Sequence, residues 1–304
     1  MDFKNILNII YKDCSRIENH GKIANYIPEL AKVNPDKFGM FLLTNENEHY
    51  EIGDSQEKFS IQSLSKVISL TIATELIGQD LWKRVEVEPS GTPFNSLTEL
   101  ERDKGIPRNP FINAGAIVVA DVLLSVLDNP IDDFLTFIRK LADDDQIFYN
   151  EKVAKSEKDF GYRNTALVNY MKALDNIENE VDDILNFYYH QCAIDMTCEQ
   201  LAKTFSIFAN SGKKISTNEQ VISAKSVKRI NAIIQTCGFY DEPGEFAFRG
   251  GLPGKRGVGG GIVAVHPKAY VVVIWSPKLN TKGNSNLGIH ALEDLTNLSG
   301  LSVF

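Results

Sequence analysis

Strand-like segments lie near both ends of this chain, and this arrangement restricts the fold more than any other feature of the sequence. Residues 38–44 and 49–52 predict a hairpin, with the turn in the polar run between them. Residues 245–249, 258–265 and 269–275 predict three short strands joined by Gly/Pro turns. If strands from both ends of the chain pair in one sheet, the residues between them in sequence form either part of the same domain or an inserted one.

The middle of the chain is helical in pattern. Apolar residues continue from Ala114 to Leu127, Pro130 stands at the first turn of the next helix, and Thr197-Cys198-Glu199-Gln200 is a capping box. Further helices are predicted near the amino end, after Asn164, before Gly238, and through residues 287–295. These patterns predict an α+β fold, with a mostly antiparallel sheet flanked by helices from both chain ends and a helical domain inserted.

The predicted domains are discontinuous. We expect a sheet domain from residues 1–75 and 225–304, a helical domain from residues 76–224, and an active site between them. Residues 86–110 hold four of the eleven prolines and too little periodicity for regular structure. A loop of this length inside a compact domain is usually functional.

Composition and charge narrow the classes of function. The 304 residues carry a formal net charge of −8, with no basic run, which argues against nucleic acid and favours a small polar substrate. The amino terminus lacks the pattern of a signal peptide, and no apolar run approaches the length of a membrane span. Four scattered cysteines do not frame a secreted disulfide domain. We therefore expect a cytoplasmic protein.

Ser63 and Lys66 form a Ser-x-x-Lys pair at the start of a helix-like pattern. Positions i and i+3 share a helix face, with Cβ atoms about 5 to 6 Å apart, so a neutral Lys66 amine can reach the Ser63 hydroxyl. The same spacing recurs at residues 55–58 in a turn and at residues 211–214 at a helix end. Only Ser63 has a strand-like approach and a helical run up to Gly78. From the residues alone, Ser63 is either a nucleophile or a helix N-cap.

The glycine-rich run at residues 257–261 precedes a strand-like segment, whereas a dinucleotide fingerprint follows a strand and opens a helix. Glycines here would let the backbone approach a substrate and present an N–H group to an oxyanion, with Val258 and Ser63 as candidate donors. An edge-strand bulge is the alternative. The five histidines are scattered, which argues against a zinc site and a Ser-His-Asp triad. A lysine or tyrosine base is favoured, and no metal or other cofactor is expected.

Several separated motifs, in order along about nine-tenths of the chain, resemble the short bacterial type of serine-dependent glutaminase. They are Asn25-Tyr26-Ile27-Pro28-Glu29-Leu30, Gln62-Ser63-Leu64-Ser65-Lys66, residues 107–117, Ser156-Glu157 with Arg163-Asn164, Asn186-Phe187-Tyr188, residues 237–241, residues 251–261 and Gly283-Asn284-Ser285. That family shares the fold of serine β-lactamases and penicillin-binding proteins. The resemblance therefore implies a β-lactamase/transpeptidase-like architecture.

The resemblance also implies catalytic roles. Ser63 would attack the side-chain amide of L-glutamine, with Lys66 as its base partner. Tyr26 and Tyr240 would hold or relay protons nearby. The backbone N–H groups of Ser63 and Val258 would form the oxyanion hole.

A second set of residues would bind the amino acid itself. By resemblance, the groups that hold its α-amino and α-carboxylate ends are Asn113, Glu157, Asn164 and Tyr188, beside Ser63, Tyr240 and Val258 in the same pocket. A carboxylate suits an ammonium, and amide and phenol donors suit a carboxylate. Taken singly, Asn113 could merely cap a helix and Tyr188 could be a core residue.

Two departures from the family pattern lie beside these motifs. Tyr162 stands where a small or polar residue is expected, and Arg256 follows Lys255 where the family often has serine. We expect them to affect affinity and the pocket rim more than the reaction type. Two rivals stay open: another serine acyl-transfer hydrolase of this fold, such as a β-lactamase or peptidase, and a non-catalytic amino-acid sensor. The resemblance further implies assembly as a homodimer or homotetramer.

Overall fold

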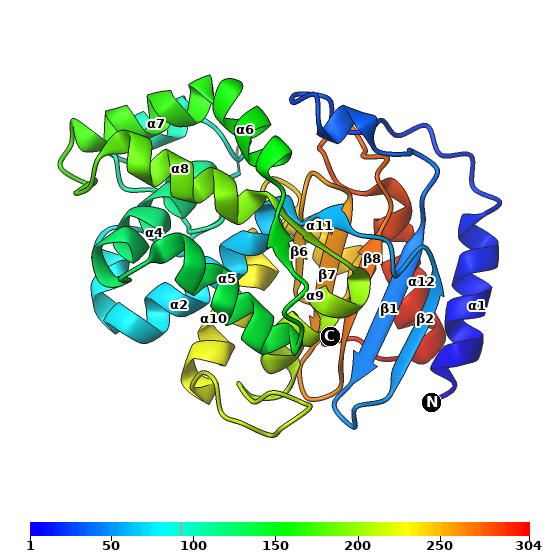
Figure 1. The fold of residues 1–304 in the computed structure, drawn as a ribbon. Coiled ribbons are helices and arrows are strands. Elements are labelled where there is room, and N and C mark those ends of the chain that lie inside the picture. Colours follow the sequence, from blue (N-terminus) through cyan, green and yellow to red (C-terminus); the bar gives the residue numbers. More distant parts are fainter. Residues whose placement is uncertain (92) are drawn as a thin grey trace.

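Strands from the two ends of the chain meet in a five-stranded sheet, ordered β2-β1-β8-β7-β6, in the computed structural model, which describes residues 1–91 and 93–304. The strands are β1 (Gly39–Thr44), β2 (His49–Gly53), β6 (Gly254–Arg256), β7 (Gly261–His266) and β8 (Tyr270–Trp275). Each pairing is antiparallel, and β1 lies along β8 so that Gly39 faces Trp275. The predicted α+β class with an antiparallel sheet is confirmed (Figure 1).

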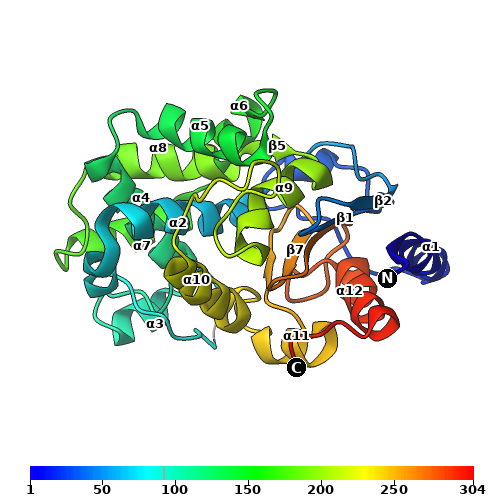
Figure 2. The ribbon, with the colours of Figure 1, turned by 90° about the horizontal axis from the view of Figure 1, so that it is seen from below.

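Both faces of the sheet are covered, which explains why its central strands β1, β7 and β8 are buried along almost their whole length. Met40 and Leu42 of β1 pack into a cluster with α1 (Phe3–Cys14) and α12 (Asn286–Ser299). Phe41 and Leu43 face the other side, where α9 (Cys198–Ala209) packs on β1 and β8. Figure 2 shows α1 and α12 together beside the sheet, away from the helical region. Because both faces are dry, alternate side chains along β1 enter two different cores.

Two buried helices, α2 (Ser65–Ile77) and α4 (Asn113–Val126), pack together in the helical region. Around them lie α3 (Leu97–Arg102), α5 (Pro130–Ala142), α6 (Glu151–Asp159), α7 (Tyr162–Lys172), α8 (Val181–Cys192) and α10 (Ala224–Cys237), with 3-10 turns η1 (Leu30–Lys32), η2 (Gln62–Leu64) and η3 (Gly78–Lys83). Across residues 1–91 and 93–304, no single helix has the length and apolar composition to cross a membrane. Among these residues, only α4 and α5 taken together are long and apolar enough, and the two helices are bent by 103° relative to each other.

A small second sheet fixes the segment that precedes Ser63. In it β5 (Ile194–Met196) pairs antiparallel with both β3 (Phe59–Ser60) and β4 (Phe148–Tyr149). The Ile61 N–H continues the pairing by donating to the Ile194 carbonyl at 2.9 Å. The chain that enters α2 is thus tied to the chain that leaves α8.

The predicted strand at residues 245–249 is wrong, because these residues lie in α11 (Pro243–Gly250). Pro243 occupies the first turn, where its missing N–H leaves no helical bond unmade. Phe246 then stacks on Phe239, with ring centroids 3.6 Å apart. The outer strand is instead β6, in a segment where we expected a turn, and β7 begins at Gly261 rather than at residue 258.

Residues 86–110 are also more regular than predicted. They contain α3, whose first turn is capped by the Ser96 hydroxyl accepting from the Glu99 N–H at 3.3 Å. The helices α6 and α8 were not predicted from the sequence as separate elements. The hairpin of β1 and β2, the capping box at Thr197, and the ends at Gly78 and Pro130 agree with expectation.

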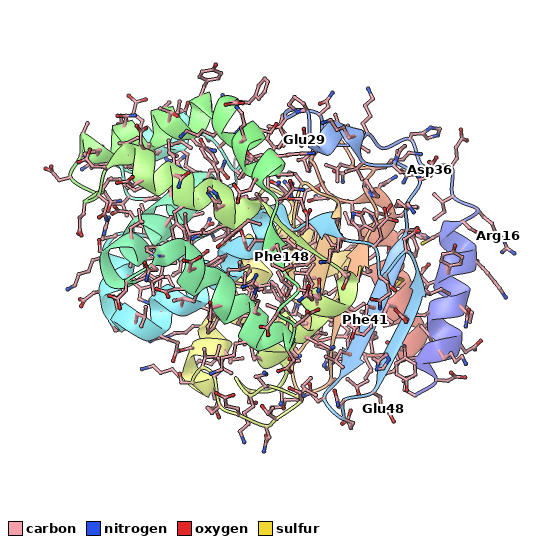
Figure 3. All side chains as sticks on the ribbon, viewed as in Figure 1. Arg16, Glu29, Asp36, Phe41, Glu48 and Phe148 are labelled. Atoms are coloured by element: carbon pink, nitrogen blue, oxygen red, sulfur yellow. The ribbon has the colours of Figure 1, made fainter. Side chains whose placement is uncertain are left out.

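The domain boundaries stay a prediction, since α9 lies within the range assigned to the helical domain and yet packs on the sheet. Most charged side chains lie at the surface of both regions. Arg16 and Asp36, for example, extend from the surface with 77% and 75% of their side chains exposed (Figure 3).

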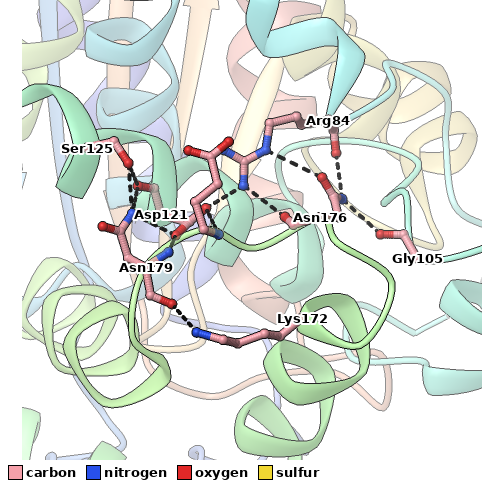
Figure 4. A network of polar contacts seen from close by, with 8 residues as sticks. Arg84, Gly105, Asp121, Ser125, Lys172, Asn176 and Asn179 are labelled. Carbon is pink, nitrogen blue, oxygen red and sulfur yellow. Dashed lines mark hydrogen bonds and ion pairs between the residues drawn. The ribbon is translucent and has the colours of Figure 1, made fainter.

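One partly buried ion pair links distant segments of the helical region, because Arg84 pairs with the fully buried Asp121 of α4 (Figure 4). The Asp121 carboxylate also accepts from the Asn179 side chain at 2.9 Å, and Arg84 donates to the Asn176 carbonyl at 2.8 Å. Asn176 reaches on to the Gly105 carbonyl at 2.9 Å. The network joins the end of η3, α4 and the loop between α7 and α8.

Candidate active site

Ser63 lies in η2, directly before α2, and Gln62 beside it has an unusual backbone conformation. Gln62 has φ of +50°, a left-handed value that costs a residue with a side chain roughly 1 kcal/mol or more. Its amide is held on both sides: Nε2 donates to the Ser60 hydroxyl at 3.0 Å, and Oε1 accepts from the Tyr26 hydroxyl at 3.2 Å. These bonds fix the turn that carries Ser63.

Lys66 is buried at the first turn of α2, with only 1% of its surface exposed. Its ammonium donates to the Phe111 carbonyl at 3.0 Å and to Asn113 Oδ1 at 2.7 Å. Asn113 in turn donates through Nδ2 to Asn164 Oδ1 at 2.9 Å. A polar chain therefore runs from the Ser-x-x-Lys helix through α4 to α7.

Tyr240 lies among three buried cations. Lys255 Nζ donates to its hydroxyl at 3.1 Å, and the cationic groups of Lys255, Arg256 and Lys66 lie 4.2, 4.5 and 5.6 Å from its ring centroid. Its backbone is also strained, with φ of +56°. Burial opposes ionisation, but the positive charges of these three cations lower the pKa of Tyr240 to about 7.

Lys255 shows the complementary effect. Burial is the main cause, aided by the charges of Lys66 and Arg256, and together they lower the pKa of Lys255 to about 8. A phenol and an amine in hydrogen-bonding contact thus both titrate near neutral pH. Such a pair can hold and move a proton at the hydroxyl of Ser63.

A cavity of about 370 Å³ brings the predicted residues together. Its lining includes eight of the nine residues singled out from the sequence: Tyr26, Ser63, Asn113, Glu157, Asn164, Tyr188, Tyr240 and Val258. Lys66 does not line it but contacts Asn113, which does. The cavity is large enough for an amino acid and mixes one carboxylate with amides and phenols.

Glu157 supplies that carboxylate. It accepts from the Tyr26 hydroxyl at 2.7 Å and is 7% exposed. Burial raises the pKa of Glu157, against the hydrogen bonds from Tyr26 and Gln62 and the charge of Lys66. Tyr26 is 49% exposed as a residue, but burial of its hydroxyl group and the Glu157 charge raise its pKa well above the ordinary value, which keeps this phenol a donor. Tyr188 is buried as well, and burial raises its pKa.

The glycine-rich run lies against the backbone that leads to Ser63. A Cβ at Gly259 would come within 2.3 Å of the Ser60 carbonyl oxygen, and one at Gly257 within 2.7 Å of the Ile61 carbonyl oxygen. The glycines therefore permit close approach of two protein segments, whereas the sequence suggested an approach to the substrate alone. Val258, between them, lines the cavity beside Ser63.

Several site residues were not predicted. Lys255 is the most important, and Gln62, Phe94, Asn95, Phe160, Arg163 and Cys192 also line or support the cavity. The sequence offered one indirect indication of Lys255. A lysine that acts as a base must lose its charge near neutral pH, and a second cation nearby would lower its pKa. The two departures differ from expectation: Arg256 is 1% exposed rather than on a rim, and Tyr162 is 79% exposed and does not line the cavity.

An antiparallel sheet with helices from both chain ends, beside a helical region whose buried helix starts with Ser-x-x-Lys at a polar cavity, defines a protein of the β-lactamase-like fold. Comparison with known proteins narrows this class. The family model described as glutaminase matches residues 21–304. The chain therefore belongs to the glutaminase family.

Individual relatives agree along the whole length. A glutaminase of Christiangramia forsetii is 57% identical over 304 residues, covering 100% of both chains, and one of Saccharophagus degradans is 53% identical, covering 100% of this chain and 99% of its own. Among solved structures, the probable glutaminase ybaS matches with a TM-score of 0.94 at 31% identity, over 99% of this chain and 97% of that one. A probable glutaminase of Bacillus subtilis matches with a TM-score of 0.88 at 31% identity, over 99% of this chain and 96% of that one.

Proposed function

We propose that this chain hydrolyses the side-chain amide of L-glutamine to L-glutamate and ammonia through an acyl-enzyme on Ser63. The Ser63 oxygen attacks the amide carbon, the carbon–nitrogen bond breaks, and ammonia leaves with a proton from the enzyme. Water then cleaves the γ-glutamyl ester and restores the Ser63 hydroxyl. The backbone N–H groups of Ser63 and Val258 are the proposed donors to the oxyanion in both steps.

Tyr240 is the proposed direct acceptor of the Ser63 proton, with Lys66 as base partner. The place of both side chains in one cavity supports this assignment, as does the pKa of Tyr240 near 7. Lys66 lies 5.6 Å from the Tyr240 ring and supplies positive charge that favours the phenolate. Lys255 can then deliver a proton through Tyr240 to the leaving ammonia, since it donates to the Tyr240 hydroxyl.

The amino-acid end of the substrate is proposed to lie against Glu157, Asn113, Asn164 and Tyr188. Glu157 suits the α-ammonium, while amide and phenol groups suit the α-carboxylate without adding a second bare charge. Binding both the α-ammonium and the α-carboxylate would orient the side-chain amide toward Ser63. Such orientation lowers the entropic cost of the reaction and so raises its rate.

The observation that carries the proposal is that Ser63, Tyr240 and Glu157 line one cavity. Mass spectrometry after treatment with a γ-diazoketone analogue of glutamine tests it, and the adduct is expected on Ser63. Ser63→Ala should lose both the adduct and more than about a thousandfold of ammonia release. Ser211→Ala, at an exposed serine that stands at the same spacing from a lysine, should keep both. A loss below about tenfold in Ser63→Ala would contradict the proposal.

Assembly as a homodimer or homotetramer and a place in the cytoplasm remain predictions. All four cysteines are free and buried in the structure, which suits a reducing compartment. Light scattering coupled to size exclusion would give the mass in solution against 33.9 kDa for one chain.

A further inference from the structure

Arg256 stands where serine is expected, and its side chain is fixed inside the protein. Its Nη1 donates to the Gly283 carbonyl at 2.8 Å and its Nη2 to the Lys282 carbonyl at 3.0 Å. Gly283 has φ of +82°, and a Cβ there would lie 2.9 Å from Nη1. The loop at residues 282–283 is therefore shaped to receive this guanidinium.

The guanidinium faces aromatic rings rather than carboxylates. Its Cζ lies 4.5 Å from the Tyr240 ring centroid and 5.6 Å from that of Phe94. Its Nε is buried without a hydrogen-bond partner in the part of the chain that the structure describes. Glu242, a nearby carboxylate, instead contacts Lys282 at 3.0 Å and Asn284. Arg256 is thus a buried charge without a paired anion, an arrangement that is unfavourable unless some other group balances it.

Lys66 and Lys255 have the same character. Both are at most 1% exposed, and both donate to carbonyl, amide or phenol oxygens. Within residues 1–91 and 93–304, no carboxylate forms an ion pair with either lysine or with Arg256. Three buried cations therefore converge on one phenol, and the anion that this site can form at their common centre is the Tyr240 phenolate.

We propose that Arg256 is a positioning residue for the reaction: its guanidinium, held by the carbonyls of residues 282–283 against the Tyr240 ring, favours the phenolate that accepts the proton of Ser63. The transfer of the Ser63 proton to Tyr240 rests on the proposed function, whereas the effect of Arg256 on the ionisation of Tyr240 does not. The ionisation of Tyr240 is a property of the free protein.

Other charged and titratable groups also face Tyr240 and must be counted. They are Lys66 from α2, Lys255 from β6, Glu157 from α6, Tyr188 from α8, Tyr26 from the segment before η1, and Asp241 and Glu242 beside it in sequence. The anionic groups oppose the phenolate and the cations favour it. Removing one of three cations should therefore shift the balance without abolishing it.

Ultraviolet difference titration measures this directly. The absorbance change of phenolate formation is recorded for the wild type and for Tyr240→Phe without substrate, and their difference isolates Tyr240. We expect a midpoint near pH 7 in the wild type, a rise of about one pH unit in Arg256→Gln, and a return to within a few tenths in Arg256→Lys, which restores the charge. An ordinary midpoint near 10 in the wild type, or equal midpoints in wild type and Arg256→Gln, would overturn the proposal.

The pH profile of kcat/KM for glutamine gives the second readout. Its acidic limb should move up with the Tyr240 midpoint in Arg256→Gln, so that activity below both limbs falls about tenfold while activity well above them is retained. A uniform loss at all pH values would indicate a purely structural role and overturn the proposal. If the protein released no ammonia at any pH, the function proposed above would fail, while the titration would still decide the ionisation of Tyr240.

Circular dichroism checks that each variant is folded. Should Arg256→Gln not fold, Arg256→Met takes its place as the neutral variant. A wild-type midpoint near pH 7 that Arg256→Lys keeps and Arg256→Met raises by about one pH unit supports an effect of charge, and equal midpoints in all three contradict it. A midpoint that Arg256→Lys displaces by a unit or more contradicts it.

Discussion

Glu157 is the one carboxylate among the described residues that line the cavity, and it is the group that we propose to bind the α-ammonium of the substrate. Replacing it by glutamine keeps the shape and removes the charge. A hydrogen bond to a charged group contributes about 1.5 to 3 kcal/mol, so we expect KM for glutamine to rise about 10- to 100-fold in Glu157→Gln. Because burial raises the pKa of Glu157, KM should also rise in the wild type as pH falls through that pKa.

The matched control is Glu151→Gln, since Glu151 lies on the same helix with 75% of its side chain exposed and should leave KM unchanged. Glutaramate, which lacks the α-amino group, gives the sharper measurement. The wild type should prefer glutamine to glutaramate, and Glu157→Gln should lose most of that preference. If the preference survives, Glu157 does not bind the ammonium.

At the residue scale, motifs predicted the cavity better than they predicted its electrostatics. Eight of nine residues chosen from the sequence line one cavity, because each belonged to a motif with a recognisable chemical role. Lys255 was not assigned a role and Arg256 was expected at the pocket rim, since their effect on Tyr240 depends on β6 lying beside the strained turn at that residue. The sequence separation of 15 residues between Tyr240 and Lys255 carries no sign of that contact.

Among the elements, α4 is held by polar contacts at its first residue and near its middle. Its first residue, Asn113, contacts Lys66 and Asn164, and two turns later Asp121 binds Arg84 and Asn179 (Figure 4). Breaking a buried ion pair leaves an uncompensated charge and costs about 3 kcal/mol or more. We expect Asp121→Ala to lower the free energy of unfolding by about that amount, measured from urea midpoints.

The same guanidinium offers a matched control. Glu178 lies 3.2 Å from Arg84 but is 64% exposed, so Glu178→Ala should cost less than about 1 kcal/mol. Equal losses in the two variants would show that burial does not set the strength of this pair.

The prediction of secondary structure failed in two segments: the residues after Pro243, which were predicted as a strand, and the glycine-rich segment that contains β6, which was predicted as a turn. Pro243 can begin a helix as easily as it can end a strand, and only the stacking of Phe246 on Phe239 favours α11. The strand β6 is three residues long and follows a proline, so its pattern is too short to recognise. The long strands β1 and β8 and the capped helix α9 were recognisable because each has several turns or pairs of consistent pattern.

On the scale of the whole molecule, the two predicted domains share one core. A single buried cluster contains Val273 and Trp275 of the sheet, Phe205 of α9, and Ile117 of α4. Chain order reinforces this continuity, since the helical region is inserted between strands of one sheet. Separate unfolding of either part would expose apolar surface on the other, which favours a single cooperative transition.

The two tryptophans allow that expectation to be measured, because one lies in each region. Trp82 is in η3 of the helical region, and Trp275 of β8 stacks on Phe59 with centroids 5.0 Å apart. In Trp275→Phe, fluorescence reports Trp82 alone, and in Trp82→Phe it reports Trp275 alone. Within each variant we expect the fluorescence midpoint in urea to coincide with the midpoint from far-ultraviolet circular dichroism, because one core holds both regions. A Trp82 transition that precedes loss of the remaining secondary structure would instead mean that the helical region unfolds as an independent domain.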